Sequence, residues 1–282
     1  MKVVVIGGTG RIGRRLVRKL DQLGATAIAA APSRGVDALT GAGVAEALAG
    51  AEILVDVSNA PSLDGATALQ YFEAAGRNLL DAGREAGIRN HIVLSIVGVD
   101  RLLDQHYFQA KKRQEELVRA SGVPFTILRS TQFFEFIAAV VQDGTEGEIP
   151  ISPALAQPIA AADVAETLAE LALGEAAGQT LELAGPERFR LDDVATEIAT
   201  AFEDGRRIVA DVHARYFGAE LQETSLLPGP NARIGSLRFE DWLRDCLKVQ
   251  SCAEQAGPGP SVEHPGGIPT HPQAASPMLP TK

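Results

Sequence analysis

Apolar residues along the first 130 positions follow two alternating patterns. Short runs rich in Val and Ile predict buried strands, and segments with apolar residues every three or four positions predict amphipathic helices. The predicted strands are residues 3–6, 25–30, 53–57, 91–97 and 124–128, and the predicted helices are residues 10–23, 44–48, 66–86 and 104–120. Because strands and helices alternate, we expect an α/β fold with a doubly wound parallel sheet that helices cover on both faces.

The pattern weakens after residue 130, where the predicted elements are shorter. Helices are predicted at residues 133–141, 161–173, 191–202 and 238–247, and strands at residues 149–151, 180–183 and 207–210. Asp163 and Asp192 stand at the starts of two of these helices, where a carboxylate caps or complements the first turn. These elements are too few for a large independent domain, so we expect a small C-terminal α/β lobe beside the sheet.

The composition divides the chain into three parts. We expect the sheet domain over residues 1–150, the smaller lobe, a substrate lobe, over residues 151–250, and a tail over residues 251–282. The tail holds 7 of the 16 prolines and few large apolar side chains. Such a segment cannot bury enough surface to offset the entropy of ordering it, so disorder is predicted there.

Charge and cysteine content exclude several classes of protein. The net charge of −10 argues against a general nucleic-acid binder. No apolar run reaches the roughly 18–20 residues of a membrane-spanning helix. Cys246 and Cys252 form neither a disulfide framework nor a metal-ligand spacing. We therefore expect a cytoplasmic protein with a small-molecule substrate and with no membrane, nucleic acid or metal as partner, and homodimer formation stays open.

A glycine-rich loop directly follows the first predicted strand and opens the first predicted helix. Gly7, Gly10 and Gly13 stand three residues apart in the run Gly-Gly-Thr-Gly-Arg-Ile-Gly. A sharp turn, a close approach of the backbone to a pyrophosphate and tight packing of helix on strand each exclude a Cβ atom. The helix N-terminus then offers amides and a positive dipole to the anion. The loop therefore predicts a dinucleotide site.

The end of the second predicted strand favours NADP(H) over NAD(H). An acid at this place would hold the ribose diol of NAD and repel a 2′-phosphate. Here the strand is followed by Ser33 and Arg34, which can both donate to a phosphate, and Arg11 and Arg14 add positive charge nearby. The alternative is that Arg34 is a solvated loop residue.

Three polar residues carry candidate catalytic chemistry. Ser95 lies near the end of the fourth predicted strand, where parallel sheets bind ligands, and could orient a substrate carbonyl. Tyr107 and Lys111 are four residues apart and hence on one face of a helix. A lysine there can hold the nicotinamide ribose and lower the pKa of the phenol, which makes the phenol a usable proton donor or acceptor. A Tyr–Lys pair at this spacing also occurs by chance on surface helices.

Together with the segment Ser-Gly-Val-Pro-Phe-Thr-Ile-Leu-Arg at 121–129, these motifs resemble the short-chain dehydrogenase/reductase superfamily. More narrowly, the chain resembles its atypical NmrA-like, NAD(P)H-binding branch, over about residues 1–250, and the runs 131–136 and 213–218 look typical of bacterial members. The resemblance implies an NAD(P)-binding Rossmann domain over residues 1–150 and a lobe that closes the substrate cleft.

The resemblance also implies roles for particular residues. The residues that it places around the pyrophosphate are Gly7, Thr9, Gly10, Arg11, Ile12 and Gly13. It places Ser33 and Arg34 at the 2′-phosphate, Asn59 along the adenosine side, and Lys111 at the ribose hydroxyls. Some members of the branch bind the dinucleotide without catalysis and act as redox-sensing regulators.

Three functions stay open from the sequence. The leading hypothesis is an NADP(H)-dependent oxidoreductase that acts on a small carbonyl or quinone-like substrate, with Tyr107 moving the proton. The alternatives are a non-catalytic redox sensor and, less favoured, an isomerase or epimerase that keeps its cofactor. Phe133, Phe134 and Phe136 could line an apolar substrate pocket, but we favour buried core for Phe133 and Phe136.

Overall fold

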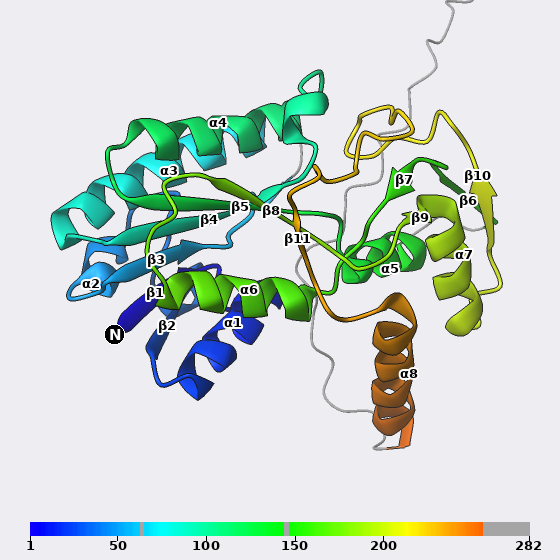
Figure 1. Cartoon of the computed structure of the whole chain (residues 1–282), viewed down its shortest axis with the longest axis horizontal. Helices are drawn as coiled ribbons and strands as arrows, with labels where there is room; N and C mark the ends of the chain where they lie inside the picture. Colours follow the sequence, from blue (N-terminus) through cyan, green and yellow to red (C-terminus); the bar gives the residue numbers. More distant parts are fainter. Residues whose placement is uncertain (63–64, 144–146, 256–282) are drawn as a thin grey trace, which may run out of the picture.

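The fold is built around one seven-stranded parallel sheet, seen near edge-on at the left of Figure 1. The computed structural model describes residues 1–62, 65–143 and 147–255. The strand order is β11-β8-β5-β4-β3-β1-β2. The strands are β1 (Lys2–Ile6), β2 (Thr26–Ala30), β3 (Ile53–Asp56), β4 (Asn90–Ile96), β5 (Phe125–Ser130), β8 (Thr180–Ala184) and β11 (Arg233–Ile234). The predicted fold class, a doubly wound parallel sheet, is confirmed.

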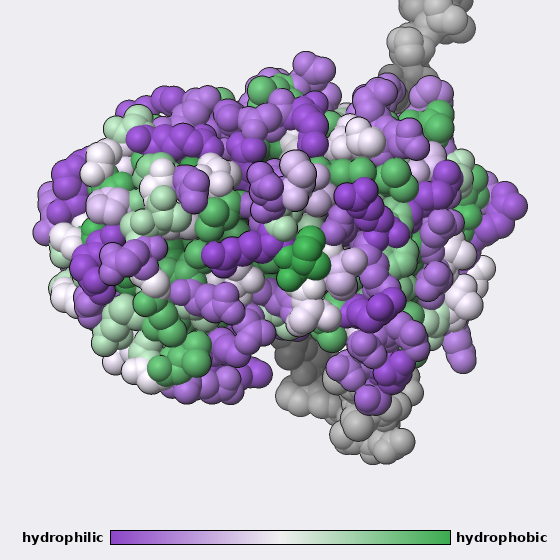
Figure 2. Space-filling model, in the orientation of Figure 1, coloured by the Kyte–Doolittle hydropathy of each residue, from purple (hydrophilic) through white to green (hydrophobic). Residues whose placement is uncertain are grey.

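Helices cover both faces of this sheet (Figure 1). One face carries α1 (Arg11–Gln22) and α6 (Ala161–Leu173), and the other carries α2 (Val44–Leu48), α3 (Gly65–Ala86) and α4 (His106–Ala120). Hydrophilic residues predominate on the outer side of α3 and α4, at the top of Figure 2. Both faces of the sheet are therefore buried, which explains why its strands are nearly continuous apolar runs.

The strand order reverses beside β1. From β1 the chain moves outward to β2 on one side, and then crosses to β3 on the other side. The loops that leave the carboxyl ends of β1 and β3 consequently diverge, and a crevice forms between them. The glycine loop leaves β1 at this place, so the topology directs it toward the crevice.

The second part of the molecule is a lobe at the right of Figure 1. It contains α5 (Phe134–Gln142), α7 (Leu191–Ala201) and α8 (Phe239–Gln255). Two small sheets complete it: β6 (Glu148–Ile151) with β10 (Arg207–Ala210), and β7 (Leu155–Ala156) with β9 (Phe189–Arg190). Residues after 150 thus contribute both to this lobe and, through α6, β8 and β11, to the main sheet.

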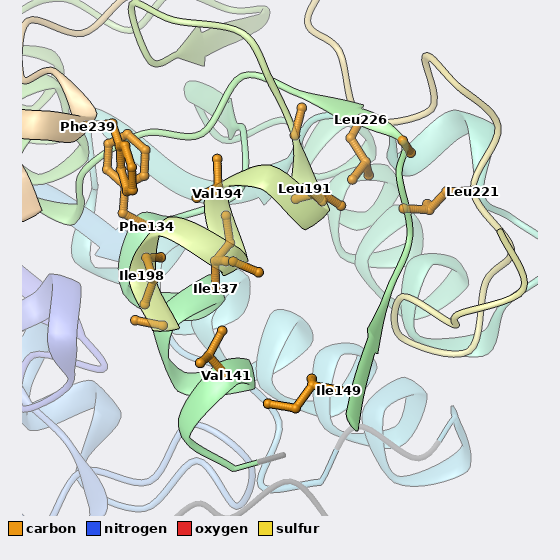
Figure 3. Packing of buried hydrophobic residues seen from close by; sticks show 14 of the residues in the cluster. Phe134, Ile137, Val141, Ile149, Leu191, Val194, Ile198, Leu221, Leu226 and Phe239 are labelled. Atoms are coloured by element: carbon orange, nitrogen blue, oxygen red, sulfur yellow. The ribbon is translucent and has the colours of Figure 1, made fainter. Parts of the chain in front are cut away.

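The largest apolar cluster fills the lobe, and Figure 3 shows how its side chains converge from α5, α7 and the loops. Phe134 belongs to this cluster and has no exposed surface, and its ring centroid is 5.2 Å from each of the rings of Phe239 and Trp242. Phe134 is therefore a core residue and not part of a pocket.

Most predicted elements appear with ends shifted by one or two residues. Asp163 and Asp192 lie in the first turns of α6 and α7, as predicted. Asp163 does more, because its Oδ2 accepts a hydrogen bond of 2.9 Å from the Leu237 amide and so ties the segment before α8 to α6. The strands β7, β9 and β11 were missed, since two residues carry no periodicity. α8 extends to Gln255, and the rest of the predicted tail lies outside the described residues.

In the part of the chain that the structure describes, no helix combines the length and the apolar character needed to cross a membrane.

Candidate active site

A cavity of about 780 Å³ lies at the carboxyl ends of β1, β3, β4 and β5, between the sheet and the lobe. One end is lined by the glycine loop, with Gly7, Thr9, Gly10, Arg11 and Ile12. The other end is lined by Ser95, Tyr107 and Lys111 together with Gln132, Phe133, Phe136, Tyr216 and Phe217. The two groups of residues that the sequence singled out thus share one cavity of a size typical for small-ligand sites.

The glycine loop is shaped by contacts that leave no room for side chains. Gly7 has a φ of +78°, and a Cβ there would lie 2.9 Å from the Ser58 nitrogen. A Cβ on Gly13 would lie 2.1 Å from the Gly7 carbonyl oxygen. Gly13 is not among the residues that line the cavity, so its place is in the packing of α1 against the loop.

The N-terminus of α1 faces this loop and fits an anion. Gly10 is the N-cap residue and offers no side-chain oxygen to the first-turn amides, which no other described side chain caps. Uncapped amides and the positive end of the helix dipole are the features that bind phosphate groups. Arg11 lines the cavity and donates a hydrogen bond of 2.9 Å to the Glu135 carbonyl, across to the lobe. The residues present therefore fit the pyrophosphate of a dinucleotide.

Ser33 and Arg34 lie in a single turn after β2, and both side chains are exposed. Neither lines the cavity, whereas their neighbours Ala31 and Pro32 do. An acid from the loop that follows this turn does line the cavity, namely Asp37. Its carboxylate accepts a hydrogen bond of 2.9 Å from the Leu39 amide. The sequence reasoning missed it by looking for an acid only at the end of the strand.

Tyr107 projects from the first turn of α4 and is 6% exposed. Its hydroxyl donates a hydrogen bond of 3.2 Å to Asn59 Oδ1. The loop after β3 thus brings Asn59 into contact with the phenol, and its place along the adenosine side stays a prediction. Burial raises the pKa of Tyr107 to about 12, and the hydrogen bond with Asn59 opposes this only in part.

Lys111 does not lower the pKa of this phenol, in contrast to the sequence expectation. The two side chains share one face of α4, but the Lys111 amine donates to the Leu94 carbonyl at 2.8 Å and to Gln114 Oε1 at 2.6 Å. The amine also lies 4.6 Å from the centre of the Phe72 ring, a cation–π contact. Burial lowers the pKa of Lys111 to about 8, while the carboxylates of Asp56 and Glu115 act in the opposite direction.

A buried carboxylate completes this arrangement. Gln114 Nε2 donates to Asp56 Oδ2 at 2.8 Å, and Asp56 Oδ1 accepts from the amide and the hydroxyl of Ser58. The side chain of Gln114 thus links the Lys111 amine to a carboxylate at the end of β3. A buried charge is tolerated only when it is paired and hydrogen-bonded, which this chain of contacts provides. The sequence signal was a lone acid at the end of an apolar strand and a glutamine three residues after the lysine.

Ser95 lines the cavity but is almost completely buried beneath α4. Its hydroxyl makes no hydrogen bond of normal geometry to any residue that the structure describes, although it lies near the Glu115 carboxylate. That carboxylate pairs with Arg129 through two hydrogen bonds of 2.8 and 2.6 Å. Burial alone would raise the pKa of Glu115, but Arg129 brings it below its usual value. The ion pair fixes α4 on β5 and with it the position of Tyr107.

The aromatic residues after β5 divide between two places. Phe133 and Phe136 are half-buried and line the cavity, and Phe133 also packs against the apolar cluster under α1 and α6, so neither is fully buried core. Phe133 and Phe136 face the cavity while Phe134, between them, faces the lobe, because α5 begins at Phe134 and its ring turns into the lobe. Tyr216 and Phe217, which were not singled out, complete the aromatic end of the cavity.

Comparison with models of known families matches residues 7–174 to a family described as NAD(P)H-binding. The matched part is more than half of the chain and includes the glycine loop, Tyr107 and Lys111. It confirms the resemblance carried by these motifs.

The individual curated proteins that match this chain are distant relatives, at 26% and 28% identity for the two described here. The photosystem II assembly factor Ycf39 of Cyanophora paradoxa is 26% identical over 155 residues, which are 48% of this chain and 46% of the relative. A reductase of Streptomyces griseus, named for its (4-alkanoyl-5-oxo-2,5-dihydrofuran-3-yl)methyl phosphate substrate, is 28% identical over 144 residues, which are 46% of this chain and 48% of the relative. The aligned part therefore spans about half the length of these curated relatives.

Among solved structures, an NADPH-dependent quinone oxidoreductase of Escherichia coli has a similar fold. The TM-score is 0.63 at 16% identity, over 86% of this chain and 99% of that protein. At this identity the similarity establishes the fold and leaves the chemistry to the site.

The buried Lys111 amine predicts a pH-dependent stability. Because its pKa is about 8 in the folded protein and 10.5 in an unfolded chain, only the unfolded state holds this proton between these values. The free energy of unfolding therefore rises with pH in this window, by about 1–2 kcal/mol between pH 8 and 9.5. Urea unfolding at a series of pH values should show this rise in the wild type and its loss in Lys111→Met.

The matched control is Lys248→Met, because the Lys248 side chain is 67% exposed. Its pH profile should follow the wild type. A Lys111→Met profile parallel to the wild type would mean that the Lys111 amine keeps an ordinary pKa.

Proposed function

Because this chain belongs to the NAD(P)H-binding family, we propose that it is an oxidoreductase that transfers a hydride between NADP(H) and a small carbonyl or quinone-like compound. The observation that carries the proposal is the single cavity that joins the uncapped N-terminus of α1 to the Tyr107 hydroxyl. One end fits a pyrophosphate, and the other holds a proton donor among apolar rings.

The chain's own residues supply the remaining chemistry. When bound, the nicotinamide cofactor supplies or accepts the hydride. Tyr107 donates its proton to the substrate oxygen in the direction of reduction, and its pKa of about 12 keeps the phenol protonated at neutral pH. Asn59 orients the hydroxyl through the hydrogen bond at 3.2 Å. Lys111 supplies positive charge near the ends of β3 and β4, where Gln114 and Asp56 hold its amine.

A redox sensor is the second candidate. It is favoured by the observation that the Lys111 amine binds Leu94 and Gln114, so that the phenol and the amine are not joined in this structure. In a sensor the same cavity would bind the dinucleotide and pass its state to a partner protein without turnover.

Substitution of Tyr107 by Phe separates the two candidates. We expect NADPH oxidation with 1,4-naphthoquinone or a small aldehyde to fall about 100-fold or more in Tyr107→Phe, because the proton donor is lost. The Kd for NADPH, measured by calorimetry, should change less than about threefold, since the phenol is not part of the glycine loop that we propose binds the pyrophosphate. NADPH binding without turnover by either protein would support the sensor.

Cofactor choice is a further part of the proposal. The turn Pro32–Arg34 begins at Pro32, which lines the cavity, and a 2′-phosphate bound beside this turn would be within the reach of a flexible arginine. A hydrogen bond to a charged group contributes about 1.5–3 kcal/mol, or roughly 10- to 100-fold in affinity. We therefore propose that Arg34, assisted by Ser33, selects NADP(H).

Calorimetry at low salt should give NADPH at least about tenfold tighter than NADH in the wild type. Arg34→Ala should remove most of this difference and leave the affinity for NADH nearly unchanged. Equal or tighter binding of NADH by the wild type would contradict the role of Arg34. Asp37 would then be the residue that binds the adenosine ribose.

A further inference from the structure

A short hairpin from the lobe inserts an aromatic ring into the cavity. Tyr216 and Ala219 exchange two backbone hydrogen bonds of 2.9 Å, and Phe217 and Gly218 form the tip. Phe217 has a φ of +49°, in the left-handed region that bulky side chains rarely adopt. Such backbone strain persists only where surrounding contacts maintain it and is frequent at ligand-binding sites.

The contacts that hold Phe217 are two flat rings. Its ring centroid lies 4.9 Å from that of Tyr107 with an angle of 13° between the planes, and 5.1 Å from that of Phe136 with an angle of 14°. Tyr107 belongs to α4 on the sheet side, whereas Phe136 belongs to α5 in the lobe. The two rings therefore form a slot that is one aromatic ring thick, and the hairpin tip occupies it.

A polar group beside this slot lacks a partner. Gln132 is 4% exposed and lines the same cavity. The Gln132 amide lies near enough to the Tyr216 hydroxyl to oppose the rise in the Tyr216 pKa that burial causes. Within the described part of the chain, however, neither amide atom of Gln132 makes a hydrogen bond of normal geometry. Tyr216 in turn packs edge-on against Phe217 at 4.8 Å and Phe136 at 6.0 Å.

The slot that Phe217 occupies and the unpaired amide of Gln132 are complementary features. The ring of Phe217 fills the slot but carries no atom that can bond to an amide. A buried polar group without a partner is unfavourable, so native proteins keep few of them, often at functional sites. A flat ring that bears an oxygen would fill the slot equally well and would also satisfy Gln132.

We infer that the slot between Tyr107 and Phe136 is the substrate subsite, that Phe217 stands in the place of the substrate ring and withdraws with its hairpin, and that Gln132 binds an oxygen on that ring. The inference rests on the proposed function for the position of the reacting group, which Tyr107 borders. It assigns the selection of the substrate to Phe217 and Gln132, which belong neither to the glycine loop nor to the Tyr107–Lys111 pair. The chemical class selected is a planar ring with a hydrogen-bonding oxygen, and a saturated ring of similar size does not fit.

Binding of 1-naphthol, measured by calorimetry in the presence of NADP⁺, tests the inference without turnover. Phe217→Ala should bind 1-naphthol about tenfold more tightly than the wild type, because the slot no longer has to be vacated. Gln132→Leu should bind it about tenfold more weakly, since the amide is lost. Decahydro-1-naphthol, the saturated compound of similar size, should bind weakly to all three proteins, and binding as tight as that of 1-naphthol would overturn the selection of a planar ring.

The matched control is Phe202→Ala, which removes a half-buried ring of the lobe that does not line the cavity. It should leave the affinity for 1-naphthol within about twofold of the wild type. If Phe217→Ala lowers its melting temperature strongly, Phe217→Leu keeps the apolar volume of the tip, removes the flat ring and should show the same direction of change.

Weaker or unchanged binding of 1-naphthol by both Phe217 variants would overturn the displacement of Phe217 and make it a fixed wall. Unchanged binding by Gln132→Leu would overturn the role of the amide. Failure of the oxidoreductase proposal gives a different result, namely the expected changes in ring binding together with no consumption of NADPH.

Discussion

The close approach of α1 to the turn after β1 is the constraint on which the rest of the structure depends. The Gly7 carbonyl oxygen occupies the space that a Cβ at Gly13 would need, and a Cβ at Gly8 would lie 2.6 Å from the Ala29 Cα atom. Only residues without side chains permit this packing, and the packing directs the N-terminus of α1 at the crevice between β1 and β3. The position of the cavity and its suitability for an anion both follow from it.

The opposite end of the cavity depends on how α4 is held over the sheet. Polar contacts add to apolar packing there, with Lys111, Gln114 and Asp56 toward β3 and Glu115 with Arg129 toward β5. Charges buried in this way must be satisfied by defined partners, so they specify one position of the helix more sharply than interchangeable apolar side chains would. The consequence for function is that Tyr107 and Asn59 meet at a fixed place beside the aromatic rings.

Features that depend on local pattern could be predicted from the sequence, and features that depend on partners far along the chain could not. The strand–glycine–helix succession at β1 and the shared helix face of Tyr107 and Lys111 are local, and both were found. The contact of Gln114 with Asp56 joins residues 58 positions apart, and no local periodicity indicates it. The contact of Asn59 with Tyr107 was not predicted for the same reason, because the direction of its loop is set by packing. Phe217 escaped notice because its position depends on a positive φ at a hairpin tip.

The central claim is that the dinucleotide lies with its pyrophosphate on the glycine loop, and Gly10 tests it most directly. A Cβ at Gly10 would approach the Gly7 carbonyl oxygen to 3.2 Å, a tight contact that a shift of a few tenths of an ångström relieves, and Gly10→Val places its methyl groups where the phosphates would lie. Calorimetric titration of this variant with NADPH should give an affinity at least about 100-fold below that of the wild type, with a nearly unchanged melting temperature. An unchanged affinity in the folded variant would show that the dinucleotide binds elsewhere.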